Sequence, residues 1–353
     1  MASLLTPARL RQGFLLLLSI SVVAYTAVLL YGHGARGFIA SLDRLEWRWI
    51  VAGVALASMD WIGGGLRLWV LARQVHPRPP VKGMIIAGGM GAWGSYVTPM
   101  QAGASPMMVY AMKRAGVPLA KAMTTVLMSF IATVAFFAIC GPLAVMLGGG
   151  RALAHYGDFL GMSLLDLYKV AIGIFAVLGV VLIGVMIAPH RLSAILHRLA
   201  TALGQRSQLV ASRLHQLRDG IEQARESMQL FNTPRGWLAL FWATILSGPS
   251  HANKLLAGYV ALRAIGIEVQ FVDMLLLQTL ISSLLYFVPT PGGAGFAEVL
   301  STLVMTIYVP GNLNPIYTLV WQCIRMWFTV AFGFVVFSVW VRQGLKAIEE
   351  SPA

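Results

Sequence analysis

Long uninterrupted apolar runs dominate the chain and predict membrane-spanning helices. Residues 122–147 and 170–188 contain no charged side chain at all. A helix needs roughly 20 predominantly apolar residues to cross a bilayer. We therefore expect an all-α polytopic membrane protein with six full spans, at residues 13–31, 49–71, 122–147, 170–188, 237–262 and 316–341.

Two shorter pairs of apolar segments interrupt this series. Residues 83–97 and 103–112 form the first pair, and residues 274–288 and 294–308 form the second. The first arm of each pair has about 15 residues, which gives roughly 22 Å of helix, less than a hydrocarbon core of about 30 Å. Each pair has a Pro/Gly turn between its arms, so we expect two re-entrant helical hairpins, which a membrane tolerates where protein or a wet cavity surrounds them.

The order of these segments predicts an inverted repeat. Residues 1–150 contain two spans, a hairpin and a span, and residues 151–341 contain the same series with reversed topology. Chance similarity between apolar segments is the alternative to this interpretation. Inverted repeats are a known transporter design, with the substrate site at the interface between the halves.

Composition supports the membrane assignment. Of the 353 residues, 58% are hydrophobic and 11% are charged, whereas a soluble domain has about 25% charged residues. This balance excludes a soluble two-domain enzyme and a disordered chain. The net charge of +13 would suggest nucleic acid as a partner of a soluble protein. In a membrane protein it is explained first by orientation, because basic residues collect in cytoplasmic loops, and we expect no nucleic-acid partner.

The basic residues cluster in segments that share one side of this layout. With the N-terminus inside, these are residues 1–12, 73–82, 113–121, 189–235 and the tail 342–353. We therefore expect both termini in the cytoplasm. Arginines and leucines alternate in 189–235 in a way that predicts a basic amphipathic helix pair on anionic lipids of the inner leaflet; a cytoplasmic partner or a coiled-coil dimer is the alternative.

Five ionisable residues fall inside the expected spans and hairpins: Asp60, Arg67, Lys254, Glu298 and Arg325. Such residues are costly at membrane depth and are candidates for function. Structural explanations compete with this one. Arg67 could extend to the inner headgroups, Asp60 could form an ion pair with Arg325, and Glu298 could brace the second hairpin turn.

The functional interpretation is an anion site for a lipid headgroup. Lys254 and Arg325, with Arg67 on the inner side, would attract a phosphate, and one positive charge remains if Asp60 and Glu298 each pair with a cation. The turns contribute Thr98, Pro99 and Gly103 from the first hairpin and Pro291, Gly292, Gly293 and Gly295 from the second. We expect free backbone amides at these last glycines to bind the same anion. His251, three residues before Lys254, is either a proton carrier or a packed core residue.

Motifs for catalysis or metal binding are absent from the sequence. It contains no G-x-S-x-G, H-E-x-x-H, P-loop or D-x-D pattern, and Cys140 and Cys323 do not have a metal-ligand spacing. We therefore expect no enzymatic activity, no metal and no cofactor.

The two hairpin turns resemble the signatures of a known family. The first runs from Thr98 to Pro106 and is followed by Tyr110 and the segment 113–117; the second runs from Pro289 to Glu298 and matches P-x-P-G-G-x-G-x-x-E. They are similar to the flippase-like membrane region of lysylphosphatidylglycerol synthases, in its stand-alone form without the synthase domain. The resemblance extends from the second span to the last, and an arginine in the last span, here Arg325, also fits.

This resemblance implies a lipid flippase fold in the bacterial plasma (inner) membrane. The expected function is movement of a phospholipid or lipid-linked headgroup between leaflets. An accessory or binding subunit for polyprenyl-lipid glycosylation, and a membrane enzyme acting on lipid phosphate, are the alternatives. Two departures bear on the headgroup. Many members carry an acidic residue and an arginine where this chain has residues 105–108, and many carry Glu-Arg where it has Ser129 and Phe130.

The charge distribution generates a topology prediction. Single cysteines replacing Ser3 and Ser351, in a background lacking Cys140 and Cys323, should stay unlabelled by a membrane-impermeant maleimide in intact cells and become labelled after permeabilisation. Labelling of either position in intact cells would contradict cytoplasmic termini.

Overall fold

The computed structural model describes residues 7–31, 38–39, 42–43, 45–144, 146–147, 163–187 and 229–349. Most of these residues are helical, and none of them lies in a β-strand. Most of the basic segment 189–235 and the two chain ends lie outside the described residues, so the expectations for them remain predictions.

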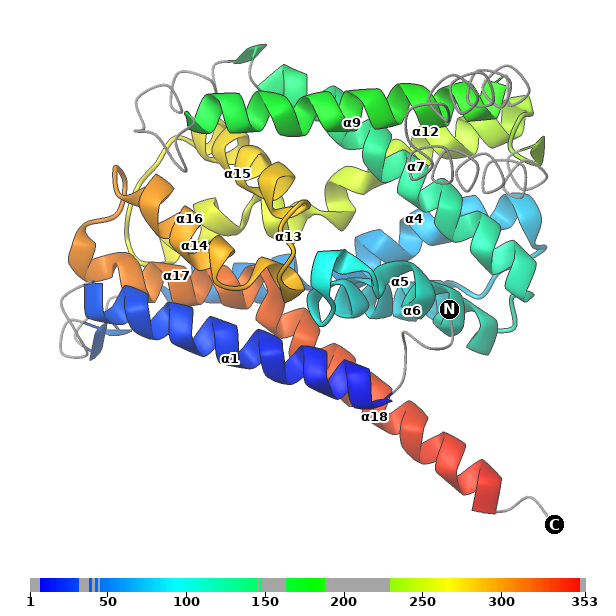
Figure 1. The fold of residues 1–353 in the computed structure, drawn as a ribbon, viewed down its shortest axis with the longest axis horizontal. Helices are drawn as coiled ribbons and strands as arrows, with labels where there is room; N and C mark the ends of the chain where they lie inside the picture. Colours follow the sequence, from blue (N-terminus) through cyan, green and yellow to red (C-terminus); the bar gives the residue numbers. More distant parts are fainter. Residues whose placement is uncertain are drawn as a thin grey trace, which may run out of the picture.

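Four helical stretches in the described part of the chain are long and apolar enough to cross a membrane: Gln12–Leu30, Trp47–Val75, Leu119–Ala144 and Gly311–Gln343. They belong to α1 (Pro7–Tyr31), to α3 (Trp47–Ala57) with α4 (Met59–Val75), to α7 (Leu119–Ala144), and to η5 (Gly311–Leu313), α17 (Asn314–Gln322), η6 (Cys323–Trp327) and α18 (Phe328–Glu349). These four coincide with the first, second, third and sixth expected spans. In Figure 1, α1 lies alongside α17 and α18 at one edge of the helical assembly.

The fourth and fifth expected spans have a different character. The fourth is α9 (Leu164–Ile187), whose apolar part is the shorter stretch Tyr168–Gly184. The fifth is broken into α12 (Pro234–Ser250), α13 (Ala252–Leu255) and α14 (Ala257–Ala264). Pro249 lies near the first break, where a proline removes a helical hydrogen bond. The break places Lys254 in the single turn of α13.

Each expected hairpin is a pair of short helices in contact. The first consists of α5 (Val81–Tyr96), the turn η2 (Pro99–Gln101) and α6 (Ala104–Arg114). The second consists of α15 (Phe271–Leu285), the turn η4 (Pro291–Gly293) and α16 (Phe296–Met305). The two turns, far apart in sequence, contact each other.

The two turns share a backbone conformation as well as a sequence pattern. Thr98 and Thr290 are extended, as a residue before proline prefers to be. The residue after each proline is left-handed: Met100 has φ 52° and Gly292 has φ 59°. Glycine adopts this region freely, whereas a side chain there is strained.

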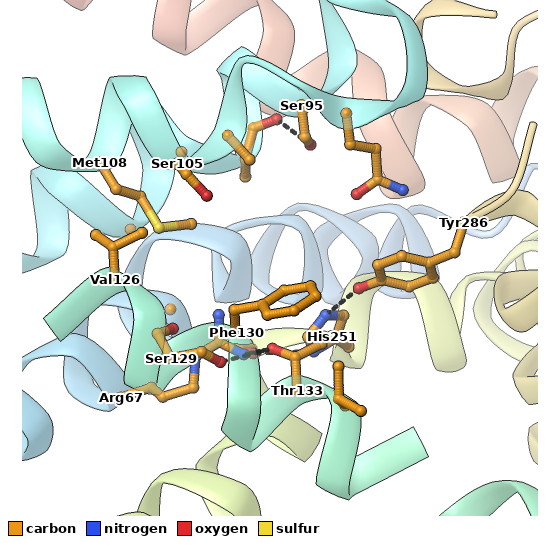
Figure 2. A pocket seen from close by; sticks show the side chains of 18 of the residues that line it. Arg67, Ser95, Ser105, Met108, Val126, Ser129, Phe130, Thr133, His251 and Tyr286 are labelled. Atoms are coloured by element: carbon orange, nitrogen blue, oxygen red, sulfur yellow. Dashed lines mark hydrogen bonds between the residues drawn. The ribbon is translucent and has the colours of Figure 1, made fainter. Parts of the chain in front are cut away.

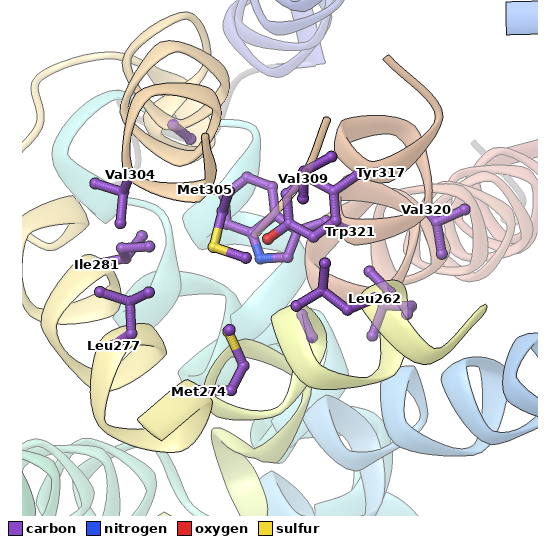
Figure 3. Close-up of a cluster of buried hydrophobic side chains, with 14 of the residues drawn as sticks. Leu262, Met274, Leu277, Ile281, Val304, Met305, Val309, Tyr317, Val320 and Trp321 are labelled. Atoms are coloured by element: carbon purple, nitrogen blue, oxygen red, sulfur yellow. The ribbon is translucent and has the colours of Figure 1, made fainter. Parts of the chain in front are cut away.

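Separate apolar cores surround the two hairpins. One core joins α14, α15, α16 and α17, and Figure 3 shows Met274 and Leu277 of α15 facing Trp321 of α17. The other joins α4, α5, α6 and the start of α18, with Trp93 and Met326 among its buried members. The contact between the turns η2 and η4 therefore lies where the two cores meet.

Glycines bring α4 and α5 into close contact. A Cβ added at Gly88 of α5 would lie 2.4 Å from the backbone nitrogen of Gly65 in α4. A Cβ at Gly65 would lie 2.3 Å from Cα of Ile85. Small residues allow such close backbone approach between membrane helices, and this packing positions α4, which carries Asp60 and Arg67.

Gly88→Ala should destabilise the protein. The added methyl must push backbone apart, at a cost of about 1–3 kcal/mol, and the transition in detergent should move to a lower temperature. Gly173→Ala in α9 is the matched control, because nothing lies within 4 Å of its Cβ position, and it should leave the transition unchanged or slightly raised. Equal transitions for the two variants would contradict the close packing of α4 on α5.

Candidate functional site

A cavity of about 330 Å³ lies between the first hairpin, α4, α7 and the break between α12 and α13. Figure 2 shows Ser95, Ser105 and Met108 of the hairpin on one side. On the opposite side lie Arg67, Ser129 and Thr133, and His251 and Tyr286 lie at one end.

The cavity is bordered by exposed apolar side chains. Met100 in the turn η2 is 67% exposed, Phe130 of α7 is 47% exposed and Phe287 is 42% exposed, and all three line the cavity. The hollow therefore reaches the molecular surface between the first hairpin turn, α7 and the end of α15.

Asp60 is the most densely bonded polar group beside the cavity. It is 2% exposed. Its Oδ2 atom lies 2.9 Å from the Tyr96 hydroxyl, from Asn253 Nδ2 and from the Thr329 hydroxyl. Lys254 Nζ lies 3.3 Å from its Oδ1 atom. Both carboxylate oxygens therefore have partners, which come from α5, α13 and α18.

Arg325 is joined to this group through its backbone rather than through an ion pair. The carbonyl oxygen of Arg325 lies 2.9 Å from Asn253 Nδ2 and from the Tyr96 hydroxyl. That hydroxyl has a single proton, which it donates either to this carbonyl or to Asp60. The expectation that Asp60 pairs with Arg325 is therefore wrong, because Lys254 occupies the position of the counter-ion.

The Arg325 guanidinium is held by neutral partners. Its Nε donates to Gln322 Oε1 at 2.9 Å and its Nη2 donates to the Gly292 carbonyl at 3.0 Å. The Cζ atom of this guanidinium lies 5.0 Å from the centre of the Trp321 ring. A second, small cavity of about 30 Å³ is lined by Arg325, Gly292 and Lys254. The structure thus brings these three predicted site residues together, beside the main cavity, which Lys254 also lines.

Arg67 faces the main cavity and is only 6% exposed. Its Nη1 donates to the hydroxyls of Thr133 at 2.7 Å and Ser247 at 3.2 Å, and its Nε has no partner. Among the described residues, neither Arg67 nor Arg325 lies within 4.0 Å of a carboxylate oxygen. Arg67 is therefore a buried cation without a counter-ion, and it does not extend to a headgroup region as one interpretation expected.

His251 lines the same cavity at the break between α12 and α13. Its Nδ1 lies 2.7 Å from the Ser247 carbonyl oxygen, to which it donates, and its Nε2 lies 2.6 Å from the Tyr286 hydroxyl. Figure 2 shows this last contact at the end of the cavity. The imidazole is packed and hydrogen-bonded on both nitrogens.

The second hairpin turn uses its own polar groups internally. Glu298 Oε2 accepts from the Gly295 amide at 2.8 Å, and the Gly293 amide donates to the Thr290 carbonyl at 3.1 Å. The expectation of free amides at Gly293 and Gly295 is therefore wrong, and Glu298 braces the turn. Pro291 and these glycines shape the turn, and of these residues Gly292 alone lines one of the two cavities described above.

The first turn reaches the cavity through residues other than those predicted. Thr98 closes the turn, since its hydroxyl donates to the Gly94 carbonyl and accepts from the Gly103 amide, each at 2.7 Å. Thr98, Pro99 and Gly103 do not line the cavity, whereas Met100 and Gln101 do.

The sequence analysis did not identify the uncharged polar residues of the site. Asn253 adjoins Lys254 in an apolar run, and the four-residue spacing of Ser129 and Thr133 marks one helix face, so both carried a usable signal. Tyr96 carried none, because a tyrosine at the end of an apolar arm is equally typical of packing.

Comparison with known families identifies the chain. The family model described as lysylphosphatidylglycerol synthase TM region matches residues 14–333. The chain belongs to this family. The match confirms the resemblance that the two hairpin motifs indicated and includes every residue of the site described above. A comparison with curated proteins finds no match.

Removing the Asp60 charge should destabilise this family member. Asp60→Asn leaves Lys254 without its counter-ion, and breaking a buried pair costs about 3–5 kcal/mol. Asp273→Asn is the control, since Asp273 is exposed in the first turn of α15, and its loss should cost under about 1 kcal/mol.

The double variant Asp60→Asn/Lys254→Met should recover part of the lost stability, because it removes both charges. Thermal unfolding in detergent measures all four proteins. An Asp60→Asn transition equal to that of Asp273→Asn would contradict the role given to this carboxylate.

Proposed function

We propose that this protein moves a phospholipid or a lipid-linked headgroup between the leaflets of a bacterial plasma membrane, with both termini in the cytoplasm. The observation that carries the proposal is Arg67, a buried guanidinium that faces a 330 Å³ cavity and has no carboxylate oxygen of the described residues within 4.0 Å. A phosphate is the natural partner of a guanidinium, whose planar donors can hold two phosphate oxygens.

The shape of the cavity supports a lipid rather than a soluble anion. A lipid that crosses the membrane keeps its tails among other lipids while its headgroup passes through protein. The rim formed by Met100, Phe130 and Phe287 is apolar and exposed, whereas the interior contains Arg67 and Lys254. This combination suits a headgroup that enters sideways.

The paired hairpins support alternating access. The turns read Thr-Pro-Met-Gln-Ala-Gly and Thr-Pro-Gly-Gly-Ala-Gly, and their central residues share the left-handed conformation. We propose that they are equivalent parts of an inverted repeat, residues 1–150 and 151–341, that rock against each other around the site. Lys254, which lines both cavities, would then be passed by the headgroup on its way between the halves.

Arg67→Gln should abolish this movement while leaving the fold intact. The glutamine keeps hydrogen-bonding capacity for Thr133 and Ser247 but loses the charge. In proteoliposomes that contain a lipid with a fluorescent acyl chain, the rate at which the probe changes leaflets should fall at least tenfold.

The matched control is Arg73→Gln on the same helix, because Arg73 is exposed and stacks on Trp69 at 4.7 Å. It should leave the rate unchanged. Movement at the unaltered rate in Arg67→Gln would overturn the proposal. Lipid that is retained by the purified protein but never moved would favour the binding-subunit alternative, and a chemically altered probe would favour an enzyme.

A further inference from the structure

We infer that the headgroup is an anionic phosphodiester bearing uncharged hydroxyl groups, such as a phosphoglycerol, and that amine-bearing headgroups are disfavoured. This inference rests on the proposed function, since it names the substrate class of the same cavity. It is carried by three features of the cavity: its charge, the occupation of its carboxylate and its hydroxyl-rich wall.

The charges that line the cavity sum to a single positive charge. The formally charged lining residues in the described part of the chain are Asp60, Arg67 and Lys254. Asp60 and Lys254 neutralise each other, which leaves Arg67. A phosphodiester with no other charge carries one negative charge, so the net charge of the occupied cavity is zero. A headgroup that also carries an ammonium group is neutral overall, and the positive charge of Arg67 then remains uncompensated.

The cavity offers no free carboxylate for an ammonium group. Asp60 is its one acidic lining residue among those described. Three donors lie at 2.9 Å from Oδ2, and Lys254 occupies Oδ1. The Asp60 side chain is only 1% exposed, so an amine could reach Oδ1 only by displacing the Lys254 ammonium.

Hydroxyl groups line the walls where a headgroup would lie. Ser95 and Ser105 come from the first hairpin, Ser129 and Thr133 from α7, and Tyr286 from the end of α15. Figure 2 shows these side chains on facing sides of the hollow. Hydroxyls both donate and accept. Those of Ser95, Thr133 and Tyr286 donate to protein acceptors and keep lone pairs for the hydroxyl groups of glycerol or a sugar. In the described part of the chain, those of Ser105 and Ser129 have no protein partner and can donate to the oxygens of a phosphodiester.

The wall formed by the first hairpin and α7 is uncharged at four neighbouring positions. Ser105, Met108, Ser129 and Phe130 all line the cavity. This chain therefore has neutral side chains at the positions where an added acid would bind an amine.

The test compares headgroups on one set of tails in proteoliposomes of the full chain. Phosphatidylglycerol labelled on an acyl chain should change leaflets at least ten times faster than phosphatidylethanolamine, phosphatidylcholine or lysylphosphatidylglycerol with the same label. Equal or faster movement of any amine-bearing lipid would overturn the inference.

Two pairs of variants test the charge argument directly. Ser105→Asp at the exposed edge of the cavity, and Ser129→Asp beside Arg67, each add a carboxylate and should lower the preference for phosphatidylglycerol at least fivefold. Ser105→Asn and Ser129→Asn are neutral controls of the same size and should keep the preference. Since Ser129 is buried and its aspartate variant can fail to fold, the exposed Ser105 pair decides. An unchanged preference in Ser105→Asp would refute the role of cavity charge.

A binding measurement separates this inference from the proposed transport. Native mass spectrometry of the protein in detergent should show phosphatidylglycerol retained over phosphatidylethanolamine, and soluble glycerophosphoglycerol should not raise the thermal transition. Selective retention without movement would uphold the headgroup class and refute transport. Movement of all lipids at one rate would uphold transport and refute the headgroup class. Stabilisation by glycerophosphoglycerol equal to that by the lipid would refute a lipid ligand.

Discussion

The arrangement of this protein depends on one buried carboxylate. Removing a carboxylate from water is costly unless donors replace the water, and Asp60 meets this requirement with Tyr96, Asn253, Lys254 and Thr329. These partners come from three segments that lie far apart in sequence. The carboxylate therefore fixes the positions of α5, α13 and α18 relative to α4, and it does so beside the cavity.

The same need of a buried charge for polar partners explains the environment of Arg67. Among the described residues, Lys254 is the cation paired with Asp60, and Arg67 lies farther than 4.0 Å from this carboxylate. Arg67 is solvated by the hydroxyls of Thr133 and Ser247 instead. Hydroxyls lower the cost of burying the charge without cancelling it, which leaves a positive potential directed into the hollow.

The sequence predicted the elements of the fold well because their signals are local. Apolar runs indicated α1, α7 and the helices of the last span, and Pro/Gly turns indicated both hairpins. The break in α12–α14 was missed, because Pro249 lies in a run that is otherwise continuous. The five ionisable residues were identified from their cost in an apolar setting, but apart from the hairpin turn that Glu298 braces, their partners were not. Pairing depends on tertiary distances, so Lys254 rather than Arg325 could be assigned to Asp60 only from the structure.

The left-handed backbone at Met100 and Gln101 bears on how the lining of the cavity can change in evolution. The corresponding turn of the second hairpin has glycines at these two places, with no side chain to offer. The first turn adopts a similar course while carrying side chains that line the hollow. A new residue here would alter what the cavity wall presents while the surrounding helices keep their packing. The turn thus offers a pair of adjustable positions on a fixed frame, through which related proteins could acquire cavity walls of different chemistry.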